Sequence, residues 1–368
     1  HAEAGLRAPL WSRGLGDVYK RQVMDEPTSV LTPQEVDILF KTLLKLKSEG
    51  TSILYISHKL EEIRKLCDTA TILRLGKKVD TCTPKNTSTK KLAEMMVGSS
   101  IKAPKKLNKP AGRILLKIEN VCSLSKSQFG TPLTNIEFDL KQGEILGIGG
   151  VAGNGQDELF AVLSGEQISQ KGSISFNESN ITKFTPNQRR EIGLLSAPEE
   201  RLGHAAAPNM SLIENILITA EQSQDLVSNG FIDWKKSKAF AEKVIKEFDV
   251  RTPSSKNTAG SLSGGNLQKF VIGREILQNP TVFIVNQPTW GVDAAAASSI
   301  RQALLTLSES GAAILVISQD LDELLEISDR FAALNEGTLS QIKKTADLSF
   351  EQIGLMMGGA KDLEARNV

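Results

Sequence analysis

Paired cysteines, long apolar runs and a charge excess of one sign are all missing from this chain of 368 residues. Cys67, Cys82 and Cys122 have no metal-ligand spacing, so they are expected to be reduced thiols in a cytosolic protein. No run of about 18 apolar residues and no secretory signal pattern occurs, so we expect any membrane role to need a docking partner. A formal net charge of +1 disfavours nucleic acid as the main ligand.

One stretch of the sequence is present twice. Pro27–Met96 aligns with Pro288–Met357 without a gap, at a constant offset of 288 − 27 = 261. The apolar positions are kept, but three ionisable residues of the first copy become amides in the second: Asp25 opposite Asn286, Glu26 opposite Gln287, and His58 opposite Gln319. This pattern predicts two homologous domains, of which only the first is equipped for acid/base and metal chemistry.

The apolar spacing predicts alternating helices and strands after residue 22. In the first copy the expected elements are a helix over Pro33–Lys47, a strand over Ile53–Ile56, a helix over Lys59–Leu66 and a strand over Ala70–Leu75. Strands joined by helices favour an α/β fold with a mostly parallel sheet.

Five segments are predicted along the chain. They are a leader at 1–22, a first domain at 23–98, a basic linker at 99–113, a second domain at 114–345 and a C-terminal tail at 346–368. Residues 1–22 match nothing in the second copy, and the polar Lys20–Gln22 would be unusual at the start of a buried strand. We therefore expect native sequence to begin at Val23.

A glycine-rich loop follows the predicted strand Glu144–Ile148, which is the context of a phosphate-binding loop. Gly150 and Gly155 have the spacing of G-x-x-x-x-G-K-[ST], but Gln156 and Asp157 replace the lysine and the hydroxyl. Asp157 adds a negative charge where the phosphates would lie. Two unit charges about 4 Å apart interact at about 4 kcal/mol when the effective dielectric is near 20, so this repulsion would weaken triphosphate binding. A tight turn would also explain the glycines; taken with the repeat, they predict a loop that holds a triphosphate poorly.

A second glycine motif, Ser261–Gln268, precedes a predicted helix at Lys269–Leu277 and a strand at Thr281–Val285. It resembles the LSGGQ signature of ATP-binding cassette (ABC) ATPases, with Asn266 and Leu267 typical of the fused-cassette importers. A serine-capped helix after a turn is the alternative. The resemblance covers Val23 to about Gly359, and it implies a P-loop NTPase-like cassette fold with a β subdomain, one cassette partial and one complete.

The resemblance also implies roles for individual residues. Asp25 would be the Walker B aspartate and Mg²⁺ ligand, Glu26 the catalytic glutamate, and His58 the switch histidine. The implied nucleotide-binding residues are Ser263, Gly264, Gly265 and Gln268 of the signature and Gly150, Gly153, Gly155 and Gln156 of the glycine loop.

In this family each nucleotide lies between the phosphate loop of one cassette and the signature of the other. Asp25, Glu26 and His58 then share a site with Ser263–Gly265, and every altered residue falls in the other site. The sequence thus predicts one competent and one degenerate site. The phosphate loop of the competent site would precede Val23.

Glu199 stands where the family has the Q-loop glutamine. It lies in Leu195–Met210, whose Pro198, Gly203 and Pro208 predict a loop able to move. By resemblance, this loop lies under the coupling helix of a permease. A surface ion pair between Glu199 and Arg201 is the alternative.

The resemblance implies the ATPase subunit of a bacterial importer for nucleosides or simple sugars, using ATP and Mg²⁺ at the cytoplasmic face of the inner membrane. Expected partners are permease subunits and a substrate-binding lipoprotein or periplasmic protein, with no nucleic acid. Three segments resemble the nucleoside branch more than the ribose or galactose branch: Gly153–Gln156, Phe231–Trp234 and Gln287–Asp293. The alternatives are a soluble, ribosome-associated twin-cassette factor and a non-catalytic cassette.

Overall fold

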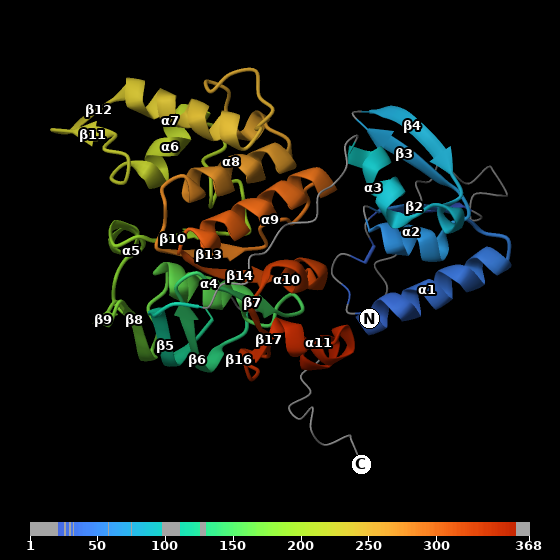
Figure 1. Cartoon of the computed structure of the whole chain (residues 1–368), viewed down its shortest axis with the longest axis horizontal. Helices are drawn as coiled ribbons and strands as arrows, with labels where there is room; N and C mark the ends of the chain where they lie inside the picture. The colour runs from blue at the N-terminus through green and yellow to red at the C-terminus, as the bar shows by residue number, and fades with distance from the viewer. Residues whose placement is uncertain are drawn as a thin grey trace, which may run out of the picture. The chain divides into compact units, whose positions relative to one another are not determined.

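The computed structural model describes residues 21–25, 27–28, 31, 33–57, 59–74, 76–97, 111–125 and 130–357. Glu26 and His58 lie outside these ranges. The chain divides into two compact units, with the described residues up to Val97 in the first and those from Ala111 in the second (Figure 1). Within these ranges no helix has the length and apolar character needed to cross a membrane.

The first unit is a short α/β arrangement. Its elements are β1 (Arg21–Asp25), α1 (Pro33–Ser48), β2 (Ser52–Ile56), α2 (Leu60–Leu66), β3 (Ala70–Arg74), β4 (Lys77–Cys82), η3 (Pro84–Asn86) and α3 (Thr89–Val97). β1 and β2 are parallel, whereas β3 and β4 form an antiparallel hairpin. A small core of Phe40, Leu43, Tyr55 and Leu66 joins α1, β2 and α2. The predicted helices and strands are confirmed, and β4, η3 and α3 are additions.

The start of β1 differs from the expected buried strand. The strand includes the polar Arg21 and Gln22, and Val23 is 64% exposed. Within the described residues β1 pairs only with β2, so it lies at an edge in this unit.

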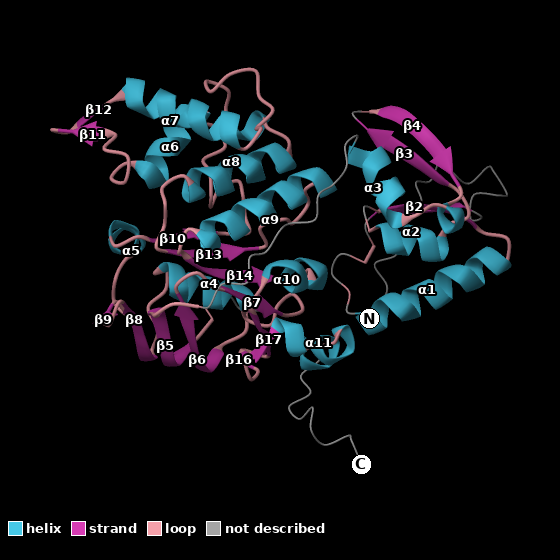
Figure 2. Cartoon of the chain, in the orientation of Figure 1, coloured by secondary structure: helices cyan, strands magenta, loops and turns pink. Residues whose placement is uncertain are grey.

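The second unit contains an antiparallel sheet and a larger, mostly parallel one (Figure 2). The antiparallel sheet has the order β6-β5-β8-β9, built from β5 (Ile114–Ser123), β6 (Leu133–Lys141), β8 (Lys171–Phe176) and β9 (Ser179–Asn180). The α/β prediction with a separate β subdomain is therefore confirmed.

The larger sheet carries the site. Its parallel strands, in spatial order, are β10 (Leu194–Ala197), β13 (Val282–Asn286), β14 (Ala313–Ser318), β7 (Ile145–Gly149) and β15 (Arg330–Asn335), and β16 (Thr338–Leu339) and β17 (Lys343–Lys344) pair antiparallel with β15. β7, β13 and β14 are buried along their whole length, as expected for parallel strands covered on both faces.

Helices follow these strands along the chain. They are α4 (Gln156–Ser164), α5 (Pro186–Glu191), α6 (Leu212–Ala220), α7 (Trp234–Glu247), α8 (Gly264–Ile276), α9 (Ala294–Glu309), α10 (Leu321–Ile327) and α11 (Phe350–Met357), with η4 (Ala259–Ser261), η5 (Thr345–Asp347) and the small hairpin β11 (Val227–Ser228) and β12 (Phe231–Ile232). In Figure 1, α6 and α7 lie together at the end of the unit that carries this hairpin. Ile353, Met356 and Met357 of α11 are buried in the core of the second unit.

The repeat is visible in the structure. Subtracting 261 from the bounds of β13, α9 and α10 gives the bounds of β1, α1 and α2. The strand register is kept as well, because Asp25 pairs with Ile56 and Asn286 pairs with Ile317 at the same offset. The two copies therefore share one local fold, and they can be compared position by position.

Two expectations about local structure are wrong. The helix predicted from Lys269 begins at Gly264, so the signature glycines form its first turn. The stretch Leu195–Met210 is not a loop throughout, since Leu195–Ala197 belong to β10 and Ala205 and Ala206 are buried. Both errors have one cause, because tertiary packing overrides the turn preference of glycine and proline here.

Candidate nucleotide site

The residues predicted for the second site lie at one edge of the parallel sheet. Gly149 ends β7 and pairs with Ser318, which ends β14, while Asn286 ends the adjacent strand β13. Because the strands are parallel, their carboxyl ends meet at this edge, which is where open α/β sheets bind ligands. The glycine loop and the start of α4 follow directly from Gly149.

The glycine loop is closed on the side chain of Gln156. Its Nε2 donates to the Val151 carbonyl at 2.8 Å, and its Oε1 accepts from the Asn154 backbone N–H at 3.0 Å. Gln156 is only 6% exposed, and Gly150 lies against its amide. Gly153 and Gly155 have φ of 83° and 106°, which explains glycine at both positions. The amide oxygen thus occupies the Asn154 N–H, a donor that could otherwise face an anion.

Asp157 and Asn286 bind each other. Asn286 Nδ2 donates to Asp157 Oδ1 at 3.3 Å, while Asn286 Oδ1 has no partner among the described residues. Burial, followed by the neighbouring charge of Glu158, raises the pKa of Asp157. The described part of the chain contains no group of three or more acidic, His or Cys side chains arranged for a metal. One carboxylate bound to an amide does not fit the Mg²⁺ role of a hydroxyl and Walker B aspartate.

Gln287 aligns with Glu26, the predicted catalytic glutamate of the first copy, but carries an amide. Its Oε1 accepts from the Gln319 backbone N–H at 3.3 Å, with a longer contact of 3.5 Å to Ser318 Oγ. Gln287 is buried and has φ of 52°. An amide has no basic lone pair near neutral pH, so this residue cannot take a proton from water.

The signature is built on the first turn of α8. Ser263 is the N-cap residue, but its Oγ accepts from Asn266 Nδ2 at 2.8 Å and does not cap the backbone. The first N–H groups of a helix have no partner within the helix, and they attract anions. Gln268 lies behind them, with Nε2 donating to the Pro288 carbonyl at 2.9 Å. Ser263, Gly264 and Gly265 thus present a helix start without a side-chain cap.

Arg201 is a neighbour of the signature that sequence reasoning placed only in the Glu199 segment. A Cβ added to Gly264 would lie 2.6 Å from Arg201 Nη1, and one added to Gly291 would lie 3.2 Å from Nη2. The guanidinium therefore lies against two glycines of the site. Nothing in the local sequence links position 201 to position 264, since only the tertiary fold brings them together.

Glu199 and Arg201 are half-buried rather than surface groups. Burial, and then the charge of Asp157, raises the pKa of Glu199. Burial lowers the pKa of Arg201, and Glu199 opposes that change. The two charges attract, but no ion pair joins them in the described part of the chain, so the structure does not support the alternative of a surface ion pair.

In the first unit the structure describes Asp25 but not Glu26 or His58. Asp25 is exposed at the end of β1, opposite Ile56 at the end of β2. The flanking residues Thr28 and Ser57 both contact Glu62 of α2, at 2.6 Å and 3.5 Å. Sequence reasoning missed Glu62, although its identity with Glu323 across the repeat was a usable signal.

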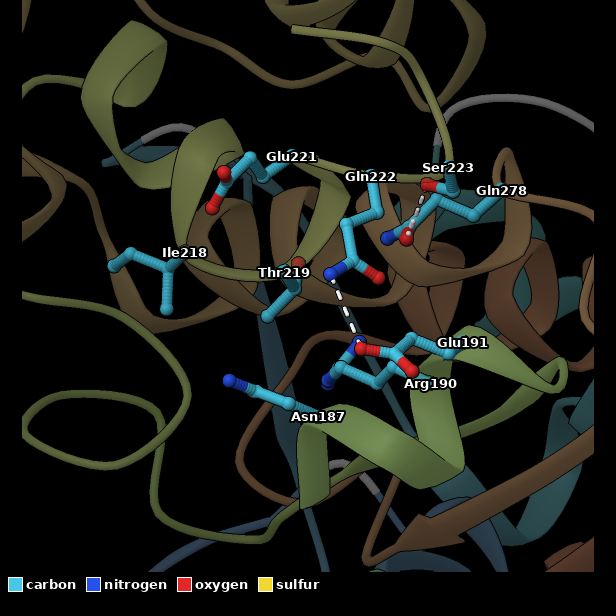
Figure 3. Close-up of a pocket in the computed structure, with 9 residues that line it drawn as sticks. All are labelled: Asn187, Arg190, Glu191, Ile218, Thr219, Glu221, Gln222, Ser223 and Gln278. Atoms are coloured by element: carbon cyan, nitrogen blue, oxygen red, sulfur yellow. Dashed lines mark hydrogen bonds between the residues drawn. The ribbon is translucent and has the colours of Figure 1, made fainter. Parts of the chain in front are cut away.

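A cavity of about 420 Å³ opens between α5 and α6 (Figure 3). Two hydrogen bonds cross its lining, from Gln222 Nε2 to Glu191 Oε1 at 3.2 Å and from Ser223 Oγ to Gln278 Oε1 at 2.8 Å. Beneath it, Arg190 pairs at 2.7 Å with the fully buried Glu275. Arg190 also donates to the Ser196 carbonyl at 3.2 Å, so one residue of the cavity lining contacts the segment that contains Glu199.

Comparison with known proteins gives one consistent family. Residues 133–290 match a family model described as ABC transporter. A glucose import ATP-binding protein of Haloferax volcanii is 35% identical, over 98% of this chain and 68% of its own length. A nucleoside import ATP-binding protein of Lactococcus lactis is 36% identical, over 92% of this chain and 67% of its own. This chain thus spans about two thirds of those relatives.

Solved structures agree on the fold. A nucleotide-free ATP-binding cassette from an ABC transporter has a TM-score of 0.53 and 22% identity, covering 68% of this chain and 98% of that one. At that identity the likeness concerns the fold, which is the cassette fold predicted from the sequence.

Proposed function

Because this chain belongs to the ABC transporter family, we propose that it is the ATP-binding and ATP-hydrolysing subunit of a bacterial importer for nucleosides or simple sugars. The two relatives described above are named for glucose and nucleoside import, which supports this substrate range. The proposal includes permease subunits, a substrate-binding lipoprotein or periplasmic protein, and work at the cytoplasmic face of the membrane. The predicted segment boundaries belong to the same proposal.

The observation that carries the proposal is the asymmetry between the two copies. In the second unit Gln156, the Asp157–Asn286 pair and Gln287 all hydrogen-bond within the site. The first copy keeps acidic residues at the positions of Asn286 and Gln287. We therefore assign hydrolysis to one composite site, in which Asp25, Glu26 and His58 act on a nucleotide bound by the Ser263–Gly265 signature.

Each residue of that site has a distinct role. Asp25 would hold Mg²⁺, an ion that neutralises phosphate charge when bound. Glu26 orients the attacking water and takes its proton, and His58 contacts the γ-phosphate. The uncapped start of α8 contributes N–H groups that favour negative charge. Phosphoryl transfer depends mainly on such positioning and charge stabilisation.

Coupling to transport is assigned to the Glu199 segment and the adjoining cavity. Burial, and then the negative charge of Asp157, raises the pKa of Glu199, and Arg190 of the cavity lining donates to the Ser196 carbonyl in the same segment. A permease segment bound in this cavity would sense changes at the nucleotide edge of the sheet. The pocket lining combines charged side chains with the exposed Ile218, which suits a peptide segment.

The test is transport by the assembled complex. The protein with its permease partners, reconstituted in vesicles, should take up a labelled nucleoside or simple sugar only when ATP is supplied. A purified complex that hydrolyses ATP but responds only to ribosomes, with no uptake of either solute class, would contradict the proposal.

A further inference from the structure

Glu62 of α2 connects the two segments that carry the proposed catalytic residues. It accepts hydrogen bonds from Thr28 Oγ1 at 2.6 Å and from Tyr55 OH at 2.7 Å. Ser57 Oγ lies 3.5 Å from the same carboxylate and itself accepts from the Lys59 backbone N–H at 3.0 Å. Thr28 is 1% exposed, so this is a largely buried set of contacts.

Two of these donors lie close in sequence to the proposed catalytic residues. Thr28 lies two residues after Glu26, and Ser57 lies immediately before His58. One carboxylate therefore touches both the segment leaving β1 and the segment leaving β2. Hydrogen bonds to a charged acceptor are roughly twice as strong as neutral ones, so Glu62 can hold the two segments in fixed register.

The second copy repeats the arrangement with two differences. Ser318 Oγ donates to Glu323 Oε2 at 2.8 Å and accepts from the Asp320 N–H at 3.1 Å. Burial raises the pKa of Glu323 and the nearby Thr289 hydroxyl opposes that rise only in part, while Glu323 Oε1 has no hydrogen-bond partner among the described residues. The tyrosine of the first copy is Val316 here. The complete set of donors is therefore found beside the proposed competent site.

We propose that Glu62, assisted by the Tyr55 hydroxyl, is a positioning residue for ATP hydrolysis that sets the relative placement of Glu26 and His58. The inference rests on the proposed function and adds a residue to its site. Glu62 does not touch the nucleotide or take the proton. It acts by restricting the two segments, and misplacement of reacting groups by about 1 Å can lower a rate by about 10²-fold.

The repeat offers a matched control for the test. Glu62→Ala and Glu323→Ala remove equivalent carboxylates in the same fold, and each would be made in the full protein assembled with its permease. We expect Glu62→Ala to lower the kcat of ATP hydrolysis by about 10-fold or more with little change in the KM for ATP. Glu323→Ala should lower the melting temperature but leave kcat within about twofold. Equal kcat losses in both variants would reduce Glu62 to a structural role and overturn the proposal.

Two more conservative variants keep the proposal testable if Glu62→Ala does not fold. Glu62→Gln keeps one acceptor oxygen and should recover part of the lost kcat, and Tyr55→Phe should lower kcat by a few-fold at an unchanged melting temperature. Wild-type kcat in both variants would contradict the proposal. If the wild-type complex itself hydrolyses no ATP, the proposed function fails first. If the wild type is active and all Glu62 variants match it, only the positioning role fails.

Discussion

Asn286 Nδ2 donates to Asp157 Oδ1 over 3.3 Å, which joins the end of β13 to the first turn of α4. In the first copy the position of Asn286 is Asp25. Asp157 stands where the phosphate-loop pattern has a hydroxyl, and Asn286 stands where the first copy has an aspartate. These two differences complement each other, because the amide donates to the carboxylate. This complementarity supports the proposal that the second site is degenerate.

The Asp157–Asn286 pair can be tested by exchanging its chemistry. Asn286→Asp alone places two carboxylates together and removes a donor, so it should destabilise the fold by about 1–3 kcal/mol near neutral pH. Adding Asp157→Ser, which restores a hydroxyl beside an aspartate, should recover most of that loss. Denaturant unfolding gives the free energy of unfolding of the single and the double variant. A double variant no more stable than Asn286→Asp would refute the coupling.

Nucleotide binding by the glycine loop should depend on Gln156. Because its amide engages Val151 and Asn154, the loop is expected to bind ATP weakly. A triple variant would combine Gln156→Lys, Asp157→Ser and Asn286→Asp. It should increase ATP affinity at this loop by about 10-fold or more, because the lysine contacts the phosphates. Calorimetric titration gives the affinity, and Gln156→Ala is the control that opens the loop without supplying a charge. Tight binding by the unaltered loop would contradict the reading.

The buried Glu323 should make stability depend on pH. Burial raises its pKa from 4.5 to about 7. Between these values the unfolded chain is ionised while the folded chain keeps its proton, so stability is greatest below the lower value and falls as pH rises towards about 7. The difference in unfolding free energy between wild type and Glu323→Gln should therefore change by about 3 kcal/mol across that window. The exposed Glu247→Gln should show no such change, and a flat difference for Glu323→Gln would show that its pKa is ordinary.

Coupling should depend on Glu199. Glu199→Ala in the assembled transporter is expected to leave basal ATP hydrolysis within about twofold, while it lowers solute uptake and the stimulation of hydrolysis by solute several-fold. Its exposed neighbour offers a control, since Glu200→Ala changes the same net charge without emptying the half-buried position. Unchanged uptake and stimulation in Glu199→Ala would move the permease contact elsewhere.

Local patterns predicted much of the fold. The helix at Pro33–Ser48 and the strand at Ser52–Ile56 were predicted to within a residue, because apolar spacing and Gly50 mark their limits. The start of α8 was misplaced, because glycines favour turns unless packing holds them in a helix.

The site was less accessible to prediction. The sequence shows that the glycine loop lacks the lysine and the hydroxyl of a phosphate-binding loop. Only the structure shows that the Gln156 amide folds back into the loop. The contacts of Arg201 with Gly264, and of Glu62 with Thr28, join positions 63 and 34 residues apart (264 − 201 and 62 − 28). Only tertiary folding brings such pairs together.

The assignment of hydrolysis to one site is tested most directly by one pair of substitutions in the full transporter. The measurement is the kcat of ATP hydrolysis for Glu26→Gln and for Gln287→Ala, with His58→Ala as a second change in the competent set. Loss of a general base should lower kcat by about 10²-fold or more in Glu26→Gln, and His58→Ala should lower it similarly. Gln287→Ala should stay within about twofold of wild type. Comparable losses from Glu26→Gln and Gln287→Ala would contradict the account, because both sites would then hydrolyse ATP.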